Sequence, residues 1–396
     1  MSRAEAPPVR DLTEDQVLWF RARRGHLAGP GAADAPAAAR RILGAQAQQL
    51  PPALLALSQR CAGRPTAAEL GARLLEPGRD LVRTWGQRDT LHLYDAAADW
   101  AAVIAARSQW APGGRRGPLP DQATLKKALR RMAQAEQPLC RSDLEDLLPA
   151  AFLRQVEEHV AGQMRAETFA AGRLVWVLAN RGDCCMGPRR GSQQSYVLRR
   201  EAYPGLPWTD VELDPLPAAT ALARRYLAVH GPASPRDLAH FFNARAPEVR
   251  GWLDVLRTAG QLAALRCGDR EDLLALAADL EELSRPAPRS TKDWPLRLLP
   301  LWDCLLMAHA DKGWTVPDEA DRKRIWRAGA FVAATVIARG RVVAIWSHKK
   351  TAKRLMVEVE PLSRWRASRH LAGVRREARA VAAHLGLAEA EVRIVP

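Results

Sequence analysis

The sequence predicts an α+β fold in which three tandem winged-helix units precede a C-terminal β-rich, barrel-like domain. Two observations carry this prediction. Short helices followed by two strands recur through the first part of the chain, and the last part alternates short strands with few helices. The chain has 396 residues, which is long enough for several domains. We expect the three units over 10–110, 118–215 and 216–288, and the C-terminal domain over 289–396.

The first unit is expected to consist of helices followed by a hairpin. Pro51 and Pro52 open one helix, because proline is favoured in a first turn. Thr66 and Glu69 have the spacing of a capping box and open another. The helices are expected over 14–24, 36–46, 51–61 and 66–75. The runs 81–85 and 89–94 are then predicted to pair as strands across a short polar turn.

The second unit follows a linker rich in Gly, Pro and Arg. Helices are expected over 122–134, from the N-cap Ser142, and around 159–165. Strands are expected over 173–180 and 195–200. The segment 181–194 between these strands is expected to be a long basic loop.

The third unit has the clearest pattern. A helix over 218–230 ends at Gly231, and Ser234 caps a second helix that ends near Asn243. A third helix over 247–258 and a strand over 262–265 follow. This order is typical of a helix-turn-helix with the start of a wing.

The last domain follows a proline-rich stretch. Strands are expected over 331–338, 341–347, 354–361 and 392–395, with a helix over 368–385 before the last of them. Several short strands of this kind favour a small barrel.

The charge of the chain indicates a polyanionic partner. Lys and Arg total 59 against 44 acidic residues, which gives a net charge of +15. Nucleic acid is the commonest such partner of a basic protein, and the preference for Arg over Lys suits phosphate. A basic protein that merely stays soluble is the alternative.

Several other classes of protein are not expected. The sequence lacks the long apolar run of a membrane span and an apolar signal core. The six cysteines form no CxxC pair, so reduced thiols are expected in a cytoplasmic protein, with no metal and no cofactor. The absence of a heptad seam favours a monomer.

The segment Gln46-Ala47-Gln48 stands before Pro51 and ahead of the predicted hairpin. Residues i and i+2 share a face of extended chain, so both amides can point the same way there. Judged by these residues alone, two solvent-facing glutamines at a helix end remain the alternative.

Four segments together resemble the AlkZ-type alkylpurine DNA glycosylases, a winged-helix family that includes enzymes unhooking interstrand crosslinks. Gln46-Ala47-Gln48 is similar to the family's Gln-Φ-Gln motif, where Φ is an aliphatic residue. The other similar segments are VRTWGQRDTLH at 82–92, MGPRRGSQQ at 186–194 and LLPLWD at 298–303.

The resemblance implies a monofunctional glycosylase acting on double-stranded DNA that carries alkylated purines such as N7-alkylguanine. It implies that Gln46 and Gln48 are catalytic and position a water molecule. Such a base leaves readily because it departs neutral, so a weakly activating amide suffices. We find no lysine placed as a Schiff-base nucleophile, so lyase activity is not expected.

Other polar residues near these segments are candidate DNA contacts. They are Arg83, Thr84, Arg88, Thr90 and His92 in the first hairpin, and Arg189 and Arg190 in the second unit. The basic run 349–354 could also contact phosphate. Asp303 is either catalytic or a structural hydrogen-bond partner at a domain junction.

Two other function classes stay open at this point. The first is a non-catalytic helix-turn-helix protein such as a transcription regulator. The second is an RNA-binding or chromatin-associated module.

Overall fold

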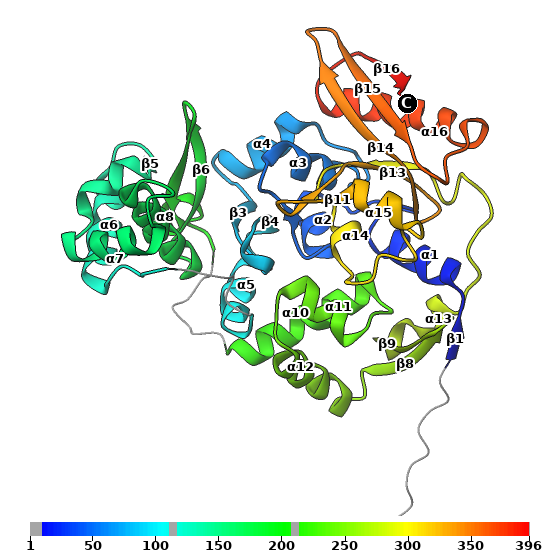
Figure 1. Cartoon of the computed structure of the whole chain (residues 1–396), viewed down its shortest axis with the longest axis horizontal. Coiled ribbons are helices and arrows are strands. Elements are labelled where there is room, and N and C mark those ends of the chain that lie inside the picture. The colour runs from blue at the N-terminus through cyan, green and yellow to red at the C-terminus, as the bar shows by residue number, and fades with distance from the viewer. Residues whose placement is uncertain (1–9, 111–116, 207–213, 396) are drawn as a thin grey trace, which may run out of the picture.

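The computed structural model describes residues 10–110, 117–206 and 214–395. It shows a mixed α+β fold (Figure 1), as predicted, in which three consecutive segments repeat one order of elements. Each segment has a helix, a short strand or bridge, further helices and a two-stranded hairpin. In each, the short strand or bridge pairs with the last strand.

The first segment follows the strand β1 (Arg10–Leu12) and the helix α1 (Glu14–Arg24). Its elements are α2 (Ala35–Arg41), β2 (Ala45–Gln46), α3 (Leu50–Ser58), α4 (Ala67–Leu75), β3 (Leu81–Trp85), η1 (Gln87–Asp89) and β4 (Leu91–Asp95). The strand order is β2-β4-β3. The predicted capping box of Thr66 and Glu69 is confirmed at the start of α4.

The predicted helix 36–46 is too long, because α2 ends at Arg41. Leu43 and Gly44 then take positive φ values of 57° and 86°. A Cβ at position 44 would lie 2.4 Å from a ring carbon of Tyr94, so only glycine fits this reversal. The chain leaves the turn extended, and Gln46 therefore lies on a strand rather than on a helix.

The next elements, α5 (Trp100–Ala106) and η2 (Arg107–Gln109), were not predicted from the sequence. Trp100 is fully buried and packs edge-on against Tyr203, with 5.3 Å between ring centroids. It belongs to a hydrophobic core that also contains Tyr94 and Leu222. The first and third segments therefore share one core.

The second segment stands to one side of the molecule, at the left of Figure 1. Its elements are α6 (Gln122–Gln134), β5 (Leu139–Cys140), η3 (Ser142–Leu147), α7 (Ala150–Val160), α8 (Ala166–Asn180), β6 (Cys184–Arg190), β7 (Gln193–Leu198) and α9 (Arg199–Ala202). The predicted strand 173–180 is wrong, since these residues form the C-terminal half of α8. An apolar run buried on most sides has no periodicity that separates a strand from a helix.

The predicted long loop 181–194 is also wrong. Its residues form β6 and the start of β7, which pair antiparallel across a tight turn at Gly191. Gly191 has a φ of 58°, which suits a glycine in a hairpin turn. The basic side chains of this region therefore stand on a hairpin, whose register shifts between Met186 and Arg189.

The third segment consists of α10 (Pro215–His230), α11 (Pro235–Phe242), α12 (Ala246–Thr258), β8 (Leu262–Cys267), β9 (Arg270–Leu276), η4 (Ala277–Asp279) and α13 (Leu280–Leu283). Ser234 caps α11 as predicted, in a capping box with Asp237. Asn243 ends that helix with a positive φ of 52°. The N-terminal strand β1 pairs parallel with β8, so the start of the chain packs on this segment.

The C-terminal region begins with β10 (Arg297–Leu299), α14 (Cys304–Met307), α15 (Glu319–Ile325), β11 (Trp326–Arg327) and β12 (Phe331–Val332). It continues with β13 (Thr335–Ala338), β14 (Arg341–Lys350), β15 (Arg354–Pro361), α16 (Ala367–His384) and β16 (Glu389–Ile394).

The predicted barrel is wrong, because β10, β13, β14, β15 and β16 form an open sheet in that order within the described residues. β15 and β16 run parallel, so the chain must cross over between them, and α16 makes this crossover. Val374 and Val381 of α16 bury against Val357 of the sheet. One face of this sheet is therefore covered by α16, instead of closing on itself as in a barrel.

In the described part of the chain, the helices are too short or too polar for any of them to cross a membrane.

A buried ion pair joins the first segment to the C-terminal region. Arg60 is 0% exposed and Asp303 is 1% exposed. The Nη1 and Nη2 atoms of Arg60 donate to Oδ2 and Oδ1 of Asp303 over 2.9 and 2.8 Å. Oδ1 of Asp303 also accepts the backbone N–H of Leu305 and so caps α14. Of the two roles considered for Asp303, the structure shows the hydrogen-bond partner between two parts of the chain.

We predict that Asp303→Ala lowers the free energy of unfolding by about 3–5 kcal/mol, because it leaves the Arg60 charge buried without its partner. Urea unfolding monitored by tryptophan fluorescence measures this loss. The double variant Arg60→Met with Asp303→Leu should lose less, because neither charge is then buried. A loss below about 1 kcal/mol for Asp303→Ala would contradict the prediction.

Candidate functional site

Three polar side chains form a row across the small sheet of the first segment. Gln46 on β2 stands in register with His92 on β4, and His92 stands in register with Thr84 on β3. Directly opposed residues of neighbouring strands share a face of the sheet. All three are buried, with Gln46 the most accessible at 8% exposed. The sequence could therefore group Gln46 with His92 and Thr84 only if β2 was known to be a strand.

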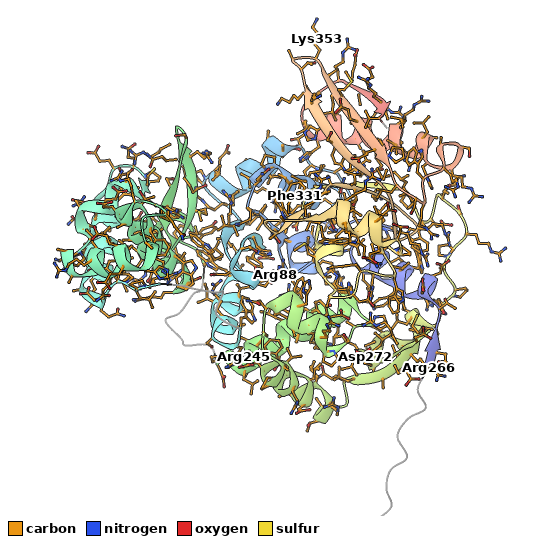
Figure 2. The ribbon with its side chains drawn as sticks, in the orientation of Figure 1. Arg88, Arg245, Arg266, Asp272, Phe331 and Lys353 are labelled. Atoms are coloured by element: carbon orange, nitrogen blue, oxygen red, sulfur yellow. The ribbon has the colours of Figure 1, made fainter. Side chains whose placement is uncertain are left out.

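Arg88 fixes the orientation of the Gln46 amide through a hydrogen bond. Its Nη2 atom donates to Oε1 of Gln46 over 3.0 Å, and its Nη1 atom donates to the carbonyl of Phe241 over 2.7 Å. Its guanidinium also lies 5.2 Å from the centre of the Phe241 ring. Figure 2 shows Arg88 near the middle of the molecule, between the first and third segments. The donor identifies the bonded atom of Gln46 as the oxygen, so the NH2 end points away from Arg88.

Arg88 reaches this position through an unusual turn. Arg88 and Asp89 both have a φ of 56°, in the left-handed region. Asp89 is held there by Nη2 of Arg107 at 2.7 Å and by the indole N–H of Trp176 at 3.0 Å. Burial lowers the pKa of Arg88 to about 10, so the side chain stays charged at neutral pH. The second segment, through Trp176, thus helps to fix the turn that orients Gln46.

His92 is a neutral member of the row. Burial, with the charge of Arg88 as a further cause, lowers its pKa from 6.5 to about 3. Its Nδ1 atom lies 3.0 Å from the carbonyl of Thr90, which places the hydrogen on Nδ1. Its Nε2 atom is then an acceptor that faces Nη2 of Arg88 at 3.5 Å. The ring also stacks on Tyr94.

Gln48 is exposed and is held by the backbone. Its Oε1 atom accepts the N–H of Leu91 over 2.7 Å. Arg83 fixes the same segment, since its Nε atom donates to the carbonyl of Ala47 over 3.0 Å and its Nη2 atom to the carbonyl of Gln48 over 3.2 Å. Both motif oxygens thus accept a hydrogen bond from the protein.

A cavity of about 440 Å³ opens beside Gln48, between the first segment and the β6–β7 hairpin. Gln48, Arg83 and Arg189 are among the residues that line it. Arg83 also donates from Nη1 to Oε1 of Gln194 over 2.9 Å and so ties the hairpin to the motif. The structure therefore brings residues of two predicted units together at one opening.

The remaining candidates differ in their access to a partner. Thr84 is fully buried, and the Thr90 hydroxyl donates to the carbonyl of Gln87. Arg190 donates to the carbonyl of Pro138 and pairs with Asp143. Arg189 is exposed. The basic run 349–354 forms the tip of the β14–β15 hairpin, where Figure 2 labels Lys353, in a part of the molecule remote from Arg88.

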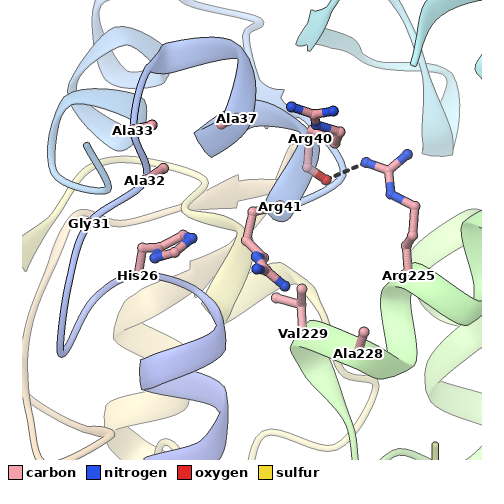
Figure 3. Close-up of a pocket in the computed structure, with 10 residues that line it drawn as sticks. All are labelled: His26, Gly31, Ala32, Ala33, Ala37, Arg40, Arg41, Arg225, Ala228 and Val229. Carbon is pink, nitrogen blue, oxygen red and sulfur yellow. Dashed lines mark hydrogen bonds between the residues drawn. The ribbon is translucent and has the colours of Figure 1, made fainter. Parts of the chain in front are cut away.

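A second basic cavity, of about 470 Å³, lies between α2 and α10 (Figure 3). Arg40, Arg41 and Arg225 line it together with His26. Arg225 pairs with Asp99 and donates to the carbonyl of Arg40, the bond that Figure 3 marks. Burial, followed by the charges of Arg24 and Arg225, lowers the pKa of the half-buried Arg41. Sequence reasoning missed this cavity, although the Arg40-Arg41 pair stands just ahead of the glutamine motif.

Within the described residues, no group of His, Cys, Asp and Glu side chains has the arrangement of a metal site. All six cysteines are buried free thiols. What the site offers to a partner is therefore amide groups and arginine charges.

Comparisons with known proteins show the family and the fold of the chain. A family model described as DNA glycosylase AlkZ-like matches residues 39–384, which include Gln46, Gln48, Arg88 and His92. The solved structure of the Streptomyces sahachiroi DNA glycosylase AlkZ is similar, with a TM-score of 0.76 and 24% sequence identity, over 97% of this chain and 100% of that chain. This likeness shows a shared fold. No curated protein matches the chain.

We predict that acid destabilises the fold through His92. In the unfolded chain this histidine takes up a proton near its ordinary pKa of 6.5, whereas in the folded protein it stays neutral down to about 3. The unfolded state therefore binds more protons in this window, and stability falls as the pH falls. Between pH 7.5 and pH 5 the loss from His92 is about 2 kcal/mol.

Urea unfolding at the two pH values measures this loss. His92→Gln cannot take up the proton, so its loss over the same window should be about 2 kcal/mol smaller than that of the wild type. Equal losses in both proteins would contradict the assigned state of His92.

Proposed function

Because the chain belongs to the AlkZ-like DNA glycosylase family, we propose that it hydrolyses the N-glycosidic bond of alkylated purines in double-stranded DNA. The substrate is a purine such as N7-alkylguanine, free or joined in an interstrand crosslink. The enzyme acts as a monomer and without lyase activity. Gln46 and Gln48 are the catalytic residues, and Arg88 is a positioning residue.

The hydrogen bond from Arg88 to Gln46 is the observation that supports this proposal best. A buried guanidinium that also binds the carbonyl of Phe241 fixes one amide in one orientation. The backbone N–H of Leu91 does the same for Gln48. Each oxygen keeps a second lone pair, and each amide keeps its NH2 group, for water and substrate. The alternative of two solvent-facing glutamines at a helix end does not describe Gln46, which is buried on a strand.

The chemistry of a cationic base suits these groups. The electron pair of the C1′–N9 bond moves to the alkylated purine, which leaves neutral, and the sugar becomes an oxocarbenium ion. A water molecule then attacks C1′ and loses its proton. Both the lesion and the developing sugar are positive, so neutral amides facing them avoid the repulsion that an exposed lysine or arginine would cause.

Arginines that line the two cavities described above suit the DNA backbone. Arg189 lines the cavity beside Gln48, and Arg41 lines the cavity between α2 and α10. Phosphate contacts of this kind fix the register of the duplex without reading its sequence. Arg83 acts differently, because its guanidinium is committed to the motif backbone and to Gln194.

We further propose that the three repeated segments are winged-helix units. The order of helices, the hairpin at the end and the pairing of the short strand or bridge with the last strand support this assignment.

We predict that Gln46→Ala combined with Gln48→Ala reduces release of N7-methylguanine to the spontaneous rate, because no amide then positions the water. Chromatography of bases released from methylated duplex DNA measures the rate, and fluorescence anisotropy measures binding, which should change less than about 3-fold. Gln49→Ala is the matched control and should retain activity. Undiminished release by the double variant contradicts the catalytic assignment, and no release by the wild type favours a non-catalytic binding protein.

We predict that Arg88→Lys lowers the single-turnover rate of base release by about 10- to 100-fold. Lysine keeps the charge but has no fork that reaches both Phe241 and Gln46. The dissociation constant for DNA should stay the same, since Arg88 acts through Gln46. The control is Arg131→Lys. Arg131 lies on α6 and forms an exposed ion pair with Asp146 of η3. Equal rates in the wild type and Arg88→Lys would show that Gln46 needs no such support.

A further inference from the structure

An arginine-lined cavity of about 690 Å³ lies at the start of α16, away from the glutamine motif. The β13–β14 turn and the segment ahead of β10 complete its walls. Figure 1 shows α16 at the upper right, whereas the sheet that carries Gln46 lies nearer the centre. Its arginines are Arg339, Arg341, Arg364, Arg366, Arg369 and Arg376. Among its lining residues Asp15 is the one carboxylate.

Two of these arginines neutralise that carboxylate. Arg341 donates from Nη1 to Asp15 over 2.7 Å and from Nη2 to Glu14 over 2.8 Å. Arg339 approaches Asp15 at 3.4 Å and lies 4.7 Å from the Trp294 ring centre. Burial opposes ionisation of Asp15, but the hydrogen bonds from Arg341 and Arg339 outweigh it and lower its pKa. The wall near α1 is therefore fixed and close to neutral.

The opposite wall carries uncompensated charge. Arg364 and Arg369 are exposed, and their guanidinium groups contact no acidic side chain within the described residues. Arg366 donates from Nη1 to the carbonyls of Ser363 and Trp365, which holds its guanidinium near the cavity mouth. The planar forks of these side chains match the oxygens of a phosphate group.

The helix start adds to this charge. α16 has 18 residues and no acidic residue in its first turn, and the side chain of its N-cap residue Arg366 makes no capping hydrogen bond. The N-terminus of a helix carries partial positive charge and favours an anion. Nδ1 of His370 accepts the N–H of Arg366 over 3.0 Å, so the ring hydrogen is on Nε2 and is available as a donor. Positive groups gathered in this way repel one another unless an anion binds between them.

We propose that this cavity binds the sugar–phosphate backbone of DNA, at a contact separate from the glutamine site. The inference rests on the proposed function, which makes DNA the polyanion that the protein meets. The exposed arginines along the mouth suit an extended anion, and guanidinium forks suit its phosphates. The contact is independent of sequence and adds affinity without taking part in base release.

The test measures binding of an undamaged duplex by fluorescence anisotropy across a salt series. In Arg364→Glu with Arg369→Glu, the slope of log K against log salt should be shallower by about 2, since two phosphate contacts are lost. Affinity at low salt should fall at least about 10-fold. The control, Arg375→Glu with Arg379→Glu, makes the same charge change on α16 at positions outside the cavity lining, and its slope should stay near that of the wild type.

Base release separates this inference from the proposed function. With protein in saturating excess, the Arg364 and Arg369 variant should release N7-methylguanine at the wild-type rate. If the wild type releases no base but the variant still has a shallower slope, the DNA contact is supported and the proposed glycosylase function is refuted. Equal slopes for the variant and its control would overturn the contact. Loss of tripolyphosphate binding with unchanged DNA binding would also overturn it, in favour of a small anion.

Discussion

The position of the glutamine motif depends on the buried pair of Arg60 and Asp303. Arg60 follows α3, and α3 begins two residues after Gln48, so anchoring its end limits where the motif can lie. Two further links run the same way, from Gln59 to the carbonyl of Leu298 and from Arg64 to Glu377. The attraction between two buried charges offsets the free energy lost on desolvation only when their geometry is good. The two hydrogen bonds from Arg60 to Asp303 provide this geometry. The C-terminal sheet is therefore a support for the site as well as a domain of its own.

Local signals in the sequence predicted much of the fold. Capping boxes at Thr66 and Ser234 mark real helix starts, because their hydrogen bonds lie within four residues of chain. The failures occur where the answer lies far away in sequence. Residues 173–180 are buried on most sides, so their sequence has no periodicity that separates a helix from a strand, and the last sheet is open with α16 crossing one face. Neither the helix at 173–180 nor the open sheet can be predicted from a window of ten residues.

The candidate site divides in the same way. The sequence placed Gln46, Gln48, Arg88 and His92 in one region, and the resemblance to a family gave the glutamines their role. It could not assign Arg88 to Gln46, because that bond needs a left-handed turn at Arg88 and a carbonyl from Phe241 in the third segment. Arg83 was expected to face a partner, yet its guanidinium mainly binds the motif backbone.

In these contacts, the charged side chains and the side chains proposed as catalytic are different residues. The buried guanidinium of Arg88 donates to the oxygen of Gln46, His92 is neutral, and the opening beside Gln48 is lined by amides together with Arg83 and Arg189. Of these two arginines Arg189 is exposed, whereas Arg83 donates to the motif backbone. Under the proposed function, Arg189 attracts the negative DNA backbone, while the positive base meets the neutral amides of Gln46 and Gln48. An unmodified purine leaves as an anion and would need a strong acid, which this row lacks. The proposed selectivity for an already charged base therefore rests on two neutral amides and on the lack of a strong acid in the row of Gln46, His92 and Thr84.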